Sequence, residues 1–221
     1  MTNVITTIFA PTEETANVAE QTMACTSEHF PDARRIAAVD LATPRLMDVL
    51  SEAGWHIVQL RNGRPPRMTR LLREATALCA DSMVWTIEMD SYIKPGAREI
   101  AEGLLDVDDA LAGVECAADN ARGRATPPTQ GREIGCKPWS NDMPAMLECT
   151  GVSFNCTCWR RVALAQANWD ELPRLSGADT ALGNQLSARG WRFGLSTAAR
   201  CIHLRSTSCK AWRAWRNRNA Q

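Results

Sequence analysis

The sequence lacks several motifs that would place a chain of 221 residues in a common nucleotide-binding or hydrolytic class. It contains no G-x-G-x-x-G and no G-x-x-x-x-G-K-[ST] motif, which disfavours a Rossmann dinucleotide site and a P-loop. It contains no G-x-S-x-G nucleophile elbow, which ranks an α/β-hydrolase low. It also has no apolar run of about 18 residues, so we expect no membrane-spanning helix.

Cysteine is abundant, but its spacing excludes some of its usual roles. The chain has nine cysteines and no C-x-x-C pair, so we do not expect a structural zinc site. The N-terminal segment has no basic flank ahead of an apolar stretch and does not resemble a secretory signal. We therefore expect a cytoplasmic protein with reduced thiols that pack in the core.

A formal net charge of zero conceals a division of charge along the chain. Residues 1–120 hold 10 Lys and Arg against 19 Asp and Glu, a balance of −9. Residues 121–221 hold 15 against 6, a balance of +9. The composition, 45% hydrophobic and 23% charged, is that of an ordinary globular domain. The asymmetry suggests an anionic partner for the second half.

Short β-branched runs alternate with helical patterns in the first half of the chain. We expect strands over residues 3–9, 35–41, 55–60 and 83–87, and helices over residues 12–27, 44–53, 68–78 and from 95 onward. Thr43 is the expected N-cap of the second helix, with Pro44 at its first position and Gly54 at its end. This alternation is typical of a mostly parallel sheet with helices on both faces, which binds ligands at the carboxyl ends of its strands.

The second half is less regular. The segment from Asp119 to Asn141 is rich in Gly, Pro, Arg and Thr and has no periodicity, so we expect a long functional loop. Beyond it we expect a strand over residues 149–158, a helix over 176–189 that ends at Gly190, and a strand over 191–196.

Two carboxylates directly follow the fourth expected strand. Glu88 and Asp90 are separated by one residue, and side chains two positions apart on an extended chain point the same way. Mg2+ binds one or two carboxylates together with substrate phosphates, so this turn could hold a divalent ion. A solvated acidic turn ahead of a helix is the alternative interpretation.

The residues around this turn resemble a known family. The string WTIEMDSYIKPGAREIAEGLL is similar to the DxD region of family 2-like glycosyltransferases of the GT-A fold, with Pro95-Gly96 at the family's distance from Asp90. Downstream, SGADTALGNQLSARGWRF resembles the family's acidic-pair segment, and CIHLRSTS follows at a fitting distance. The resemblance extends from Val4 to about Ser208. It implies an α/β fold: a single GT-A domain (nucleotide-diphospho-sugar transferase, Rossmann-like) with a central mixed, mostly parallel sheet flanked by helices.

The resemblance also implies an organisation and an activity. One domain would cover residues 1–208, with a donor nucleotide and metal half at 1–115 and an acceptor half at 116–208. The acceptor half would include a long loop at 119–147, and a basic Trp- and Arg-bearing tail would follow at 209–221. The implied activity is that of a hexosyltransferase, which moves a sugar from a nucleotide-diphosphate sugar (a UDP-sugar is favoured) to an acceptor hydroxyl. Its cofactor would be Mn2+ or Mg2+, and inverting chemistry is favoured over retaining chemistry.

Three residues match the family's metal and catalytic positions. Asp90 matches the metal ligand of the DxD region, and His203 matches a histidine that completes the metal site after the last core strand. Asp179 matches the general base that takes the proton of the acceptor hydroxyl. Ser176 and Asp179 also form the pattern of a capping box, and the two interpretations of Asp179 are compatible.

Further positions match the family's nucleotide contacts. Asp40 matches the acid that hydrogen-bonds the nucleobase, although an acidic residue ahead of a capped helix is an equal alternative. Five arginines lie between Arg61 and Arg73, and the sequence does not choose among them. The expected nucleotide-binding residues are Thr7, Phe9, Asp40, Arg70, Arg73 and Glu88.

Basic and aromatic residues gather in the second half. The expected acceptor-binding residues, all in the long loop, are Arg132, Lys137 and Trp139. The tail adds Lys210, Trp212, Arg213, Trp215, Arg216 and Arg218. Lysine and arginine neutralise phosphates and aromatic rings stack on bases, which suits a modified base in DNA as the acceptor. A lipid phosphate at a membrane surface, a glycan and a merely solvated basic face are alternatives.

Two departures from the family pattern motivate a different function. Glu88 stands where the family has Asp, and Ala178 stands where it has Glu. A non-catalytic GT-A-like module that binds an anionic polymer is therefore the alternative to an enzyme.

Overall fold

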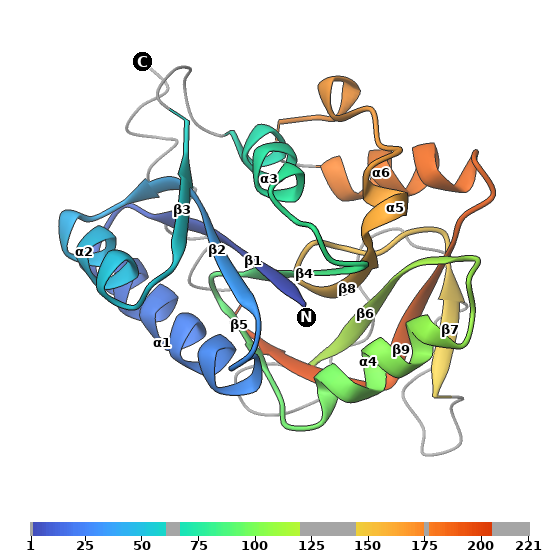
Figure 1. The fold of residues 1–221 in the computed structure, drawn as a ribbon, viewed down its shortest axis with the longest axis horizontal. Coiled ribbons are helices and arrows are strands. Elements are labelled where there is room, and N and C mark those ends of the chain that lie inside the picture. Colours follow the sequence, from blue (N-terminus) through green and yellow to red (C-terminus); the bar gives the residue numbers. More distant parts are fainter. Residues whose placement is uncertain (1, 61–66, 120–144, 175–176, 205–221) are drawn as a thin grey trace.

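A computed structural model describes residues 2–60, 67–119, 145–174 and 177–204 of the chain. Within these residues a mixed sheet of nine strands runs through the molecule in the order β3-β2-β1-β4-β8-β6-β9-β5, with β7 beside β9 (Figure 1). The strands are β1 (Asn3–Ala10), β2 (Arg34–Ala42), β3 (His56–Gln59), β4 (Met83–Glu88), β5 (Ser91–Ile93), β6 (Leu111–Asp119), β7 (Met146–Cys149), β8 (Cys156–Arg160) and β9 (Arg192–His203). The neighbours β3-β2-β1-β4 are parallel, and the antiparallel strand β8 joins β4 to β6.

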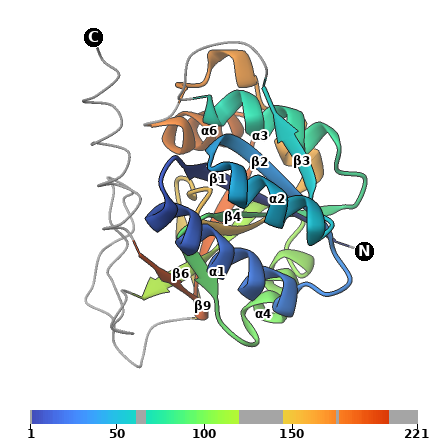
Figure 2. The same cartoon turned by 90° about the vertical axis from the view of Figure 1, so that its left-hand side faces the viewer.

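Helices cover both faces of the sheet (Figure 2). They are α1 (Glu13–His29), α2 (Pro44–Glu52), α3 (Met68–Ala77), α4 (Ala97–Asp106), α5 (Arg161–Leu164) and α6 (Ala178–Ser187), with a 3-10 turn η1 (Trp169–Glu171). Ile5 of β1 packs in one core with α3, α5 and α6, whereas Ile8 packs in another with α1 and α2. This division follows from the alternation of side chains along a strand. The α/β fold with a central mixed sheet flanked by helices is confirmed.

Local signals determine the boundaries of the first helices. The Thr12 side chain accepts a hydrogen bond from the N–H of Thr15, which caps α1, and Thr43 caps α2 in the same way through the N–H of Leu46. Gly54 follows α2 with φ of 72°, in the left-handed region where glycine carries no steric penalty. The expected N-cap and the expected helix end are both confirmed.

In the second half of the chain, the structure differs from several expectations. The segment expected as one strand over 149–158 is two strands, β7 and β8, separated by residues 150–155. Strand β6 was not expected, and its last residue, Asp119, is where we expected the long loop to begin. Strand β9 continues to His203 because it pairs with β5, β6 and β7 along its length. Helix α6 begins after Gly177, and Ser176 of the expected capping box lies outside the described residues.

The segment between β7 and β8 contains a close contact between two glycines, Gly151 and Gly183. A Cβ on Gly183 of α6 would lie 3.0 Å from the Cα of Gly151 and 3.0 Å from the carbonyl oxygen of Thr150. Backbone atoms cannot move aside as a flexible side chain can, so only glycine fits. Thr150 and Gly151, between β7 and β8, therefore pack backbone to backbone on α6.

Other expectations concern the core. The seven cysteines within the described residues are free, and all except Cys25 are buried, as expected for reduced core thiols. Trp159 is buried, and its Nε1 donates to Oγ1 of Thr86 at 2.9 Å. No helix in the described part of the chain is long and apolar enough to cross a membrane.

The glycine contact gives a prediction about stability. Gly183→Ala should lower the free energy of unfolding by about 1–3 kcal/mol, because the added methyl group meets backbone atoms. Gly103→Ala is the matched control, since a Cβ there meets nothing within 4 Å and alanine is the better helix former. It should raise stability by about 0.5–1 kcal/mol. Urea unfolding of both variants measures the difference, and equal midpoints would contradict the close contact.

Candidate metal and nucleotide site

Three side chains meet at the carboxyl end of β4. Glu88 is the last residue of β4, Asp90 lies in the following turn, and His203 is the last residue of β9. The pairing of β5 with β9 places Ser91 opposite His203, which brings the imidazole to the acidic turn. The Nε2 atom of His203 lies 3.4 Å from Oδ1 of Asp90 and 3.6 Å from Oε2 of Glu88.

The spacing and chemistry of these three groups fit a divalent ion. One ligand atom from each residue lies within 4.8 Å of the others. Two ligands that are each about 2.1 Å from one ion can be no more than about 4.2 Å apart, and both measured separations are shorter. Carboxylate oxygens with one imidazole suit Mn2+ and are compatible with Mg2+. A bound ion would be held by Glu88, Asp90 and His203.

The backbone of the acidic turn is held by three other elements. Oγ1 of Thr22 in α1 donates to the carbonyl oxygen of Met89 at 2.6 Å, and the N–H of Met89 donates to the carbonyl oxygen of Thr7 at 3.1 Å. The N–H of Leu204 donates to the carbonyl oxygen of Asp90 at 2.9 Å. The turn is therefore fixed before any ligand binds, which lowers the entropic cost of binding.

The carboxyl group of Glu88 has a pKa raised to about 7. Burial is the largest cause, because it disfavours the charged form, and the negative charge of Asp90 adds to it. His203 acts in the opposite direction, whereas Asp179 and Glu115 raise the pKa further. Three other carboxylates therefore act on the charge of Glu88, and a divalent cation would offset their repulsion.

Asp179 is one of the carboxylates whose charge raises the pKa of Glu88. It is the second residue of α6 and half-buried, and its Oδ1 accepts the N–H of Thr180 at 2.8 Å. A carboxylate at this place can accept a proton, which is the chemistry of a general base.

Asp40, at the end of β2, is bound by Arg67. The Nε and backbone N–H groups of Arg67 donate to the two oxygens of the Asp40 carboxylate at 2.8 and 2.9 Å. One terminal nitrogen of Arg67 donates to the carbonyl oxygen of Asp40 at 2.8 Å, and another to that of Leu60 at 2.7 Å. Asp40 is only 2% exposed. The pair thus connects β2 to the residue that precedes α3.

The other expected nucleotide contacts are placed by different elements. Thr7 is paired with Glu88 across β1 and β4, and its buried hydroxyl has no hydrogen-bond partner within the described residues. The N–H of Phe9 donates to Sδ of Met89 at 3.2 Å, beside the acidic turn. A buried hydroxyl without a partner is rare in folded proteins and suits a ligand or a water molecule.

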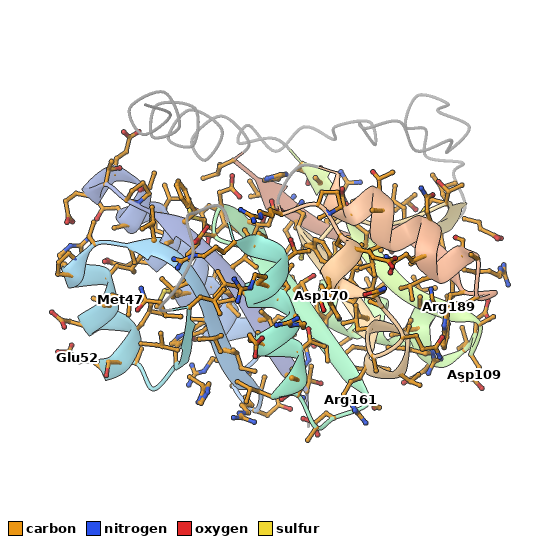
Figure 3. All side chains as sticks on the ribbon, turned by 90° about the horizontal axis from the view of Figure 1, so that it is seen from above. Met47, Glu52, Asp109, Arg161, Asp170 and Arg189 are labelled. Carbon is orange, nitrogen blue, oxygen red and sulfur yellow. The ribbon has the colours of Figure 1, made fainter. Side chains whose placement is uncertain are left out.

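The two arginines expected to contact the nucleotide lie on α3. Arg70 is exposed, and Arg73 forms ion pairs with Glu74 at 2.8 Å and Asp170 at 2.7 Å. Figure 3 shows Asp170 beside α3. The role of Arg70 and Arg73 in binding a nucleotide stays a prediction. The expected acceptor residues Arg132, Lys137 and Trp139, and the basic tail at 209–221, lie outside the described residues.

Sequence reasoning missed two residues of this region. Arg67 is one of the five arginines between Arg61 and Arg73, and only its place just before α3 distinguishes it. Glu115 lies on β6, a strand that we did not expect, so no strand pattern pointed to it.

The raised pKa of Glu88 gives a prediction about pH. The pKa of the Glu88 carboxyl is about 7 in the folded chain, whereas an unperturbed glutamate has a pKa of 4.5. Between these two pH values the folded state therefore holds a proton that the unfolded state has lost. The stability of the metal-free protein should therefore fall as pH rises from about 4.5 to about 7. Glu88→Gln removes this decline, and at pH 8 it should stabilise the metal-free protein by about 1 kcal/mol, since solvent screens a side chain that is 38% exposed.

Thermal unfolding at pH 5 and pH 8, with and without Mn2+, measures this effect. Mn2+ should stabilise the unsubstituted protein more than Glu88→Gln. Glu148→Gln is the control, because Arg192 lowers the pKa of Glu148 and its charge does not change between these pH values. A difference between the protein and Glu88→Gln that is the same at both pH values would contradict the prediction.

Comparisons with known proteins agree with this architecture. No protein-family model matches the chain, and no curated protein sequence matches it. Among solved structures, GalNAc-T7 with UDP, GalNAc and Mn2+ superposes with a TM-score of 0.66 at 8% identity, over 92% of this chain and 44% of that one. S. aureus TarS 1–349 superposes with a TM-score of 0.64 at 14% identity, over 92% and 60%.

A third structure, S. aureus TarS 1–349 in complex with UDP-GlcNAc, gives a TM-score of 0.63 at 14% identity, over 92% and 58%. This chain thus spans about half the length of the structures it matches. At sequence identities this low, the similarity shows the fold alone, and all three structures share that fold with this chain. The chain has the GT-A fold of nucleotide-sugar glycosyltransferases.

Proposed function

We propose that the chain is a metal-dependent glycosyltransferase, which moves a sugar from a nucleotide-diphosphate sugar to an acceptor hydroxyl. One observation supports it above the others: Glu88, Asp90 and His203 converge at the carboxyl edge of a GT-A sheet. The two similar proteins have been solved with UDP and Mn2+ and with UDP-GlcNAc, which favours a UDP-sugar as donor here.

Each residue of the site has a role in this proposal. Asp90 and His203 bind the ion, and Glu88 binds the ion or a ribose hydroxyl. When bound, a divalent ion would stabilise the negative charge of the departing diphosphate. Asp179 takes the proton of the acceptor hydroxyl, which makes inverting chemistry the favoured outcome.

The nucleotide would lie along the edge from β4 to β2. Thr7 offers a buried hydroxyl without a partner in the described part of the chain, and Phe9 lies beside it on β1. Asp40 would accept a hydrogen bond from the base. Arg70 and Arg73 would approach the donor from α3, where a planar guanidinium suits phosphate.

The acceptor is proposed from charge. Residues 121–221 carry a balance of +9, with 15 basic and 6 acidic residues. This charge supports an anionic acceptor, with a modified base in DNA as the first to test, and a lipid phosphate or glycan as alternatives. In this division, residues 1–115 bind the donor and, together with His203, the metal. Residues 116–208 face the acceptor through Arg132, Lys137 and Trp139, and the tail at 209–221 adds basic charge. The free core thiols favour a cytoplasmic location.

The donor site is tested by thermal shift with a panel of UDP- and GDP-sugars in the presence of Mn2+. We expect stabilisation by a UDP-sugar that depends on the metal, because a divalent ion held at this site would offset the negative charge of the diphosphate. Asp90→Asn should abolish it. Asp109→Asn is the control, since Asp109 lies at the surface with its side chain 97% exposed (Figure 3). Tight DNA binding without any shift by a nucleotide-sugar would favour the non-catalytic module instead.

The catalytic role of Asp179 is tested separately. Asp179→Asn should lower the turnover of donor hydrolysis or transfer by about 100- to 10,000-fold, because amide nitrogen cannot accept the proton. The Mn2+-dependent thermal shift by the donor should remain, because Asp179 is not among the proposed metal ligands. Turnover that survives this substitution would remove Asp179 from the mechanism.

A further inference from the structure

The segment of residues 150–155, between β7 and β8, touches two parts of the proposed site. One end packs on α6, which carries Asp179, and the other end reaches the acidic turn. The segment has no strand or helix of its own, so something must hold it in place.

Asn155 holds the acidic turn on both sides of Asp90. Its carbonyl oxygen accepts the N–H of Glu88 at 2.7 Å, and its side-chain Oδ1 accepts the hydroxyl of Ser91. Asn155 is 4% exposed and Ser91 is fully buried, so solvent does not compete for these bonds. The position of Asn155 therefore fixes the backbone on either side of Met89 and Asp90.

The other end of the segment positions α6. Gly151 meets Gly183 backbone to backbone, and a Cβ on Gly151 would lie 3.3 Å from the Cα of Gly183. The same Cβ would lie 4.0 Å from the carbonyl oxygen of Asp179. A shift of this segment would therefore move the first turn of α6 relative to the acidic turn.

Glu115 of β6 anchors the middle of the segment. Its two carboxylate oxygens accept the N–H of Ser153 at 2.9 Å and the hydroxyl of Ser153 at 2.5 Å. The Oγ atom of Ser153 in turn accepts the N–H of Asn155 at 3.3 Å, and the hydroxyl of Thr157 donates to the carbonyl oxygen of Ser153 at 2.7 Å. Hydrogen bonds to a carboxylate are stronger than those between neutral groups.

We propose that Glu115 is a positioning residue, which acts through Ser153 and Asn155 to fix the metal ligands of the acidic turn relative to Asp179. The inference rests on the proposed function for its purpose, but the chain of contacts is independent of it. Glu115 belongs to the central sheet, where β6 pairs with β8 and β9. It connects that sheet to a segment without regular structure, and through the segment to the acidic turn and to α6.

The experiment compares three substitutions with a control. Glu115→Ala removes both bonds to Ser153, Glu115→Gln keeps the shape and one acceptor oxygen, and Ser153→Ala removes the hydroxyl alone. Glu148→Ala is the control, because it removes a surface carboxylate two residues before the segment, where Glu148 pairs with Arg192. Two measurements are made on each protein: Mn2+ affinity by calorimetry, and amide hydrogen exchange of peptides that cover residues 88–93 and 178–186.

We expect Glu115→Ala to weaken Mn2+ binding by about 10- to 100-fold, as for the loss of a group that orients metal ligands. Exchange should rise in both peptides, although neither contains a substitution. Ser153→Ala should change Mn2+ affinity and hydrogen exchange in the same direction by a smaller factor. If Glu115→Ala does not fold, the result with Ser153→Ala tests the positioning role in its place. Glu115→Gln and Glu148→Ala should stay within about threefold of the unsubstituted protein, a small change on the scale where tenfold is 1.4 kcal/mol.

Different failures are distinguishable. Unchanged exchange over residues 88–93 in Glu115→Ala and Ser153→Ala would overturn the positioning role and leave the proposed enzyme intact. A loss of Mn2+ affinity in Glu115→Gln equal to that in Glu115→Ala would show that charge matters, and would also overturn it. If the unsubstituted protein binds no Mn2+, the proposed function fails, and hydrogen exchange alone then decides whether Glu115 holds the turn.

Discussion

The concentration of negative charge at the end of β4 is the constraint on which the rest of the site depends. Glu88 and Asp90 are one residue apart, and the charges of Asp179 and Glu115 also reach Glu88. The imidazole of His203 acts in the opposite direction. Carboxylates held close together away from water repel one another and relax apart unless the backbone prevents it. The hydrogen bonds to the acidic turn from several separate elements provide that restraint.

The two halves of the chain contribute different parts of this restraint. The first half supplies four parallel neighbours whose carboxyl ends share one edge of the sheet, so that β1, β2 and β4 present their last residues together. The second half closes the site through antiparallel strands. The register of β5 with β9 sets the place of His203, and the pairing of β4 with β8 leads directly from residue 155 to the acidic turn. A histidine more than 110 residues from the acids therefore arrives by strand register.

Most of the first half could be predicted because its signals are local. Thr43 with Pro44 determines where α2 begins, and the alternation of side chains places Glu88 and Asp90 together. The second half depends on contacts between distant residues. Strand β6 is buried along most of its length and shows no alternation, and Gly151, between β7 and β8, packs on Gly183, a residue distant in the sequence. The choice of Arg67 among five arginines likewise requires the position of Asp40.

The ion pair of Asp40 and Arg67 has a consequence for molecules that approach this edge. Each oxygen of the Asp40 carboxylate accepts an N–H of Arg67, and only its remaining lone pairs can meet another group. A group that docks against it must bring an N–H or O–H, since a ring nitrogen or carbonyl oxygen would face a negative charge in surroundings with little water. The geometry of Asp40 and Arg67 would thus distinguish approaching groups by their hydrogen-bond polarity, in favour of donors.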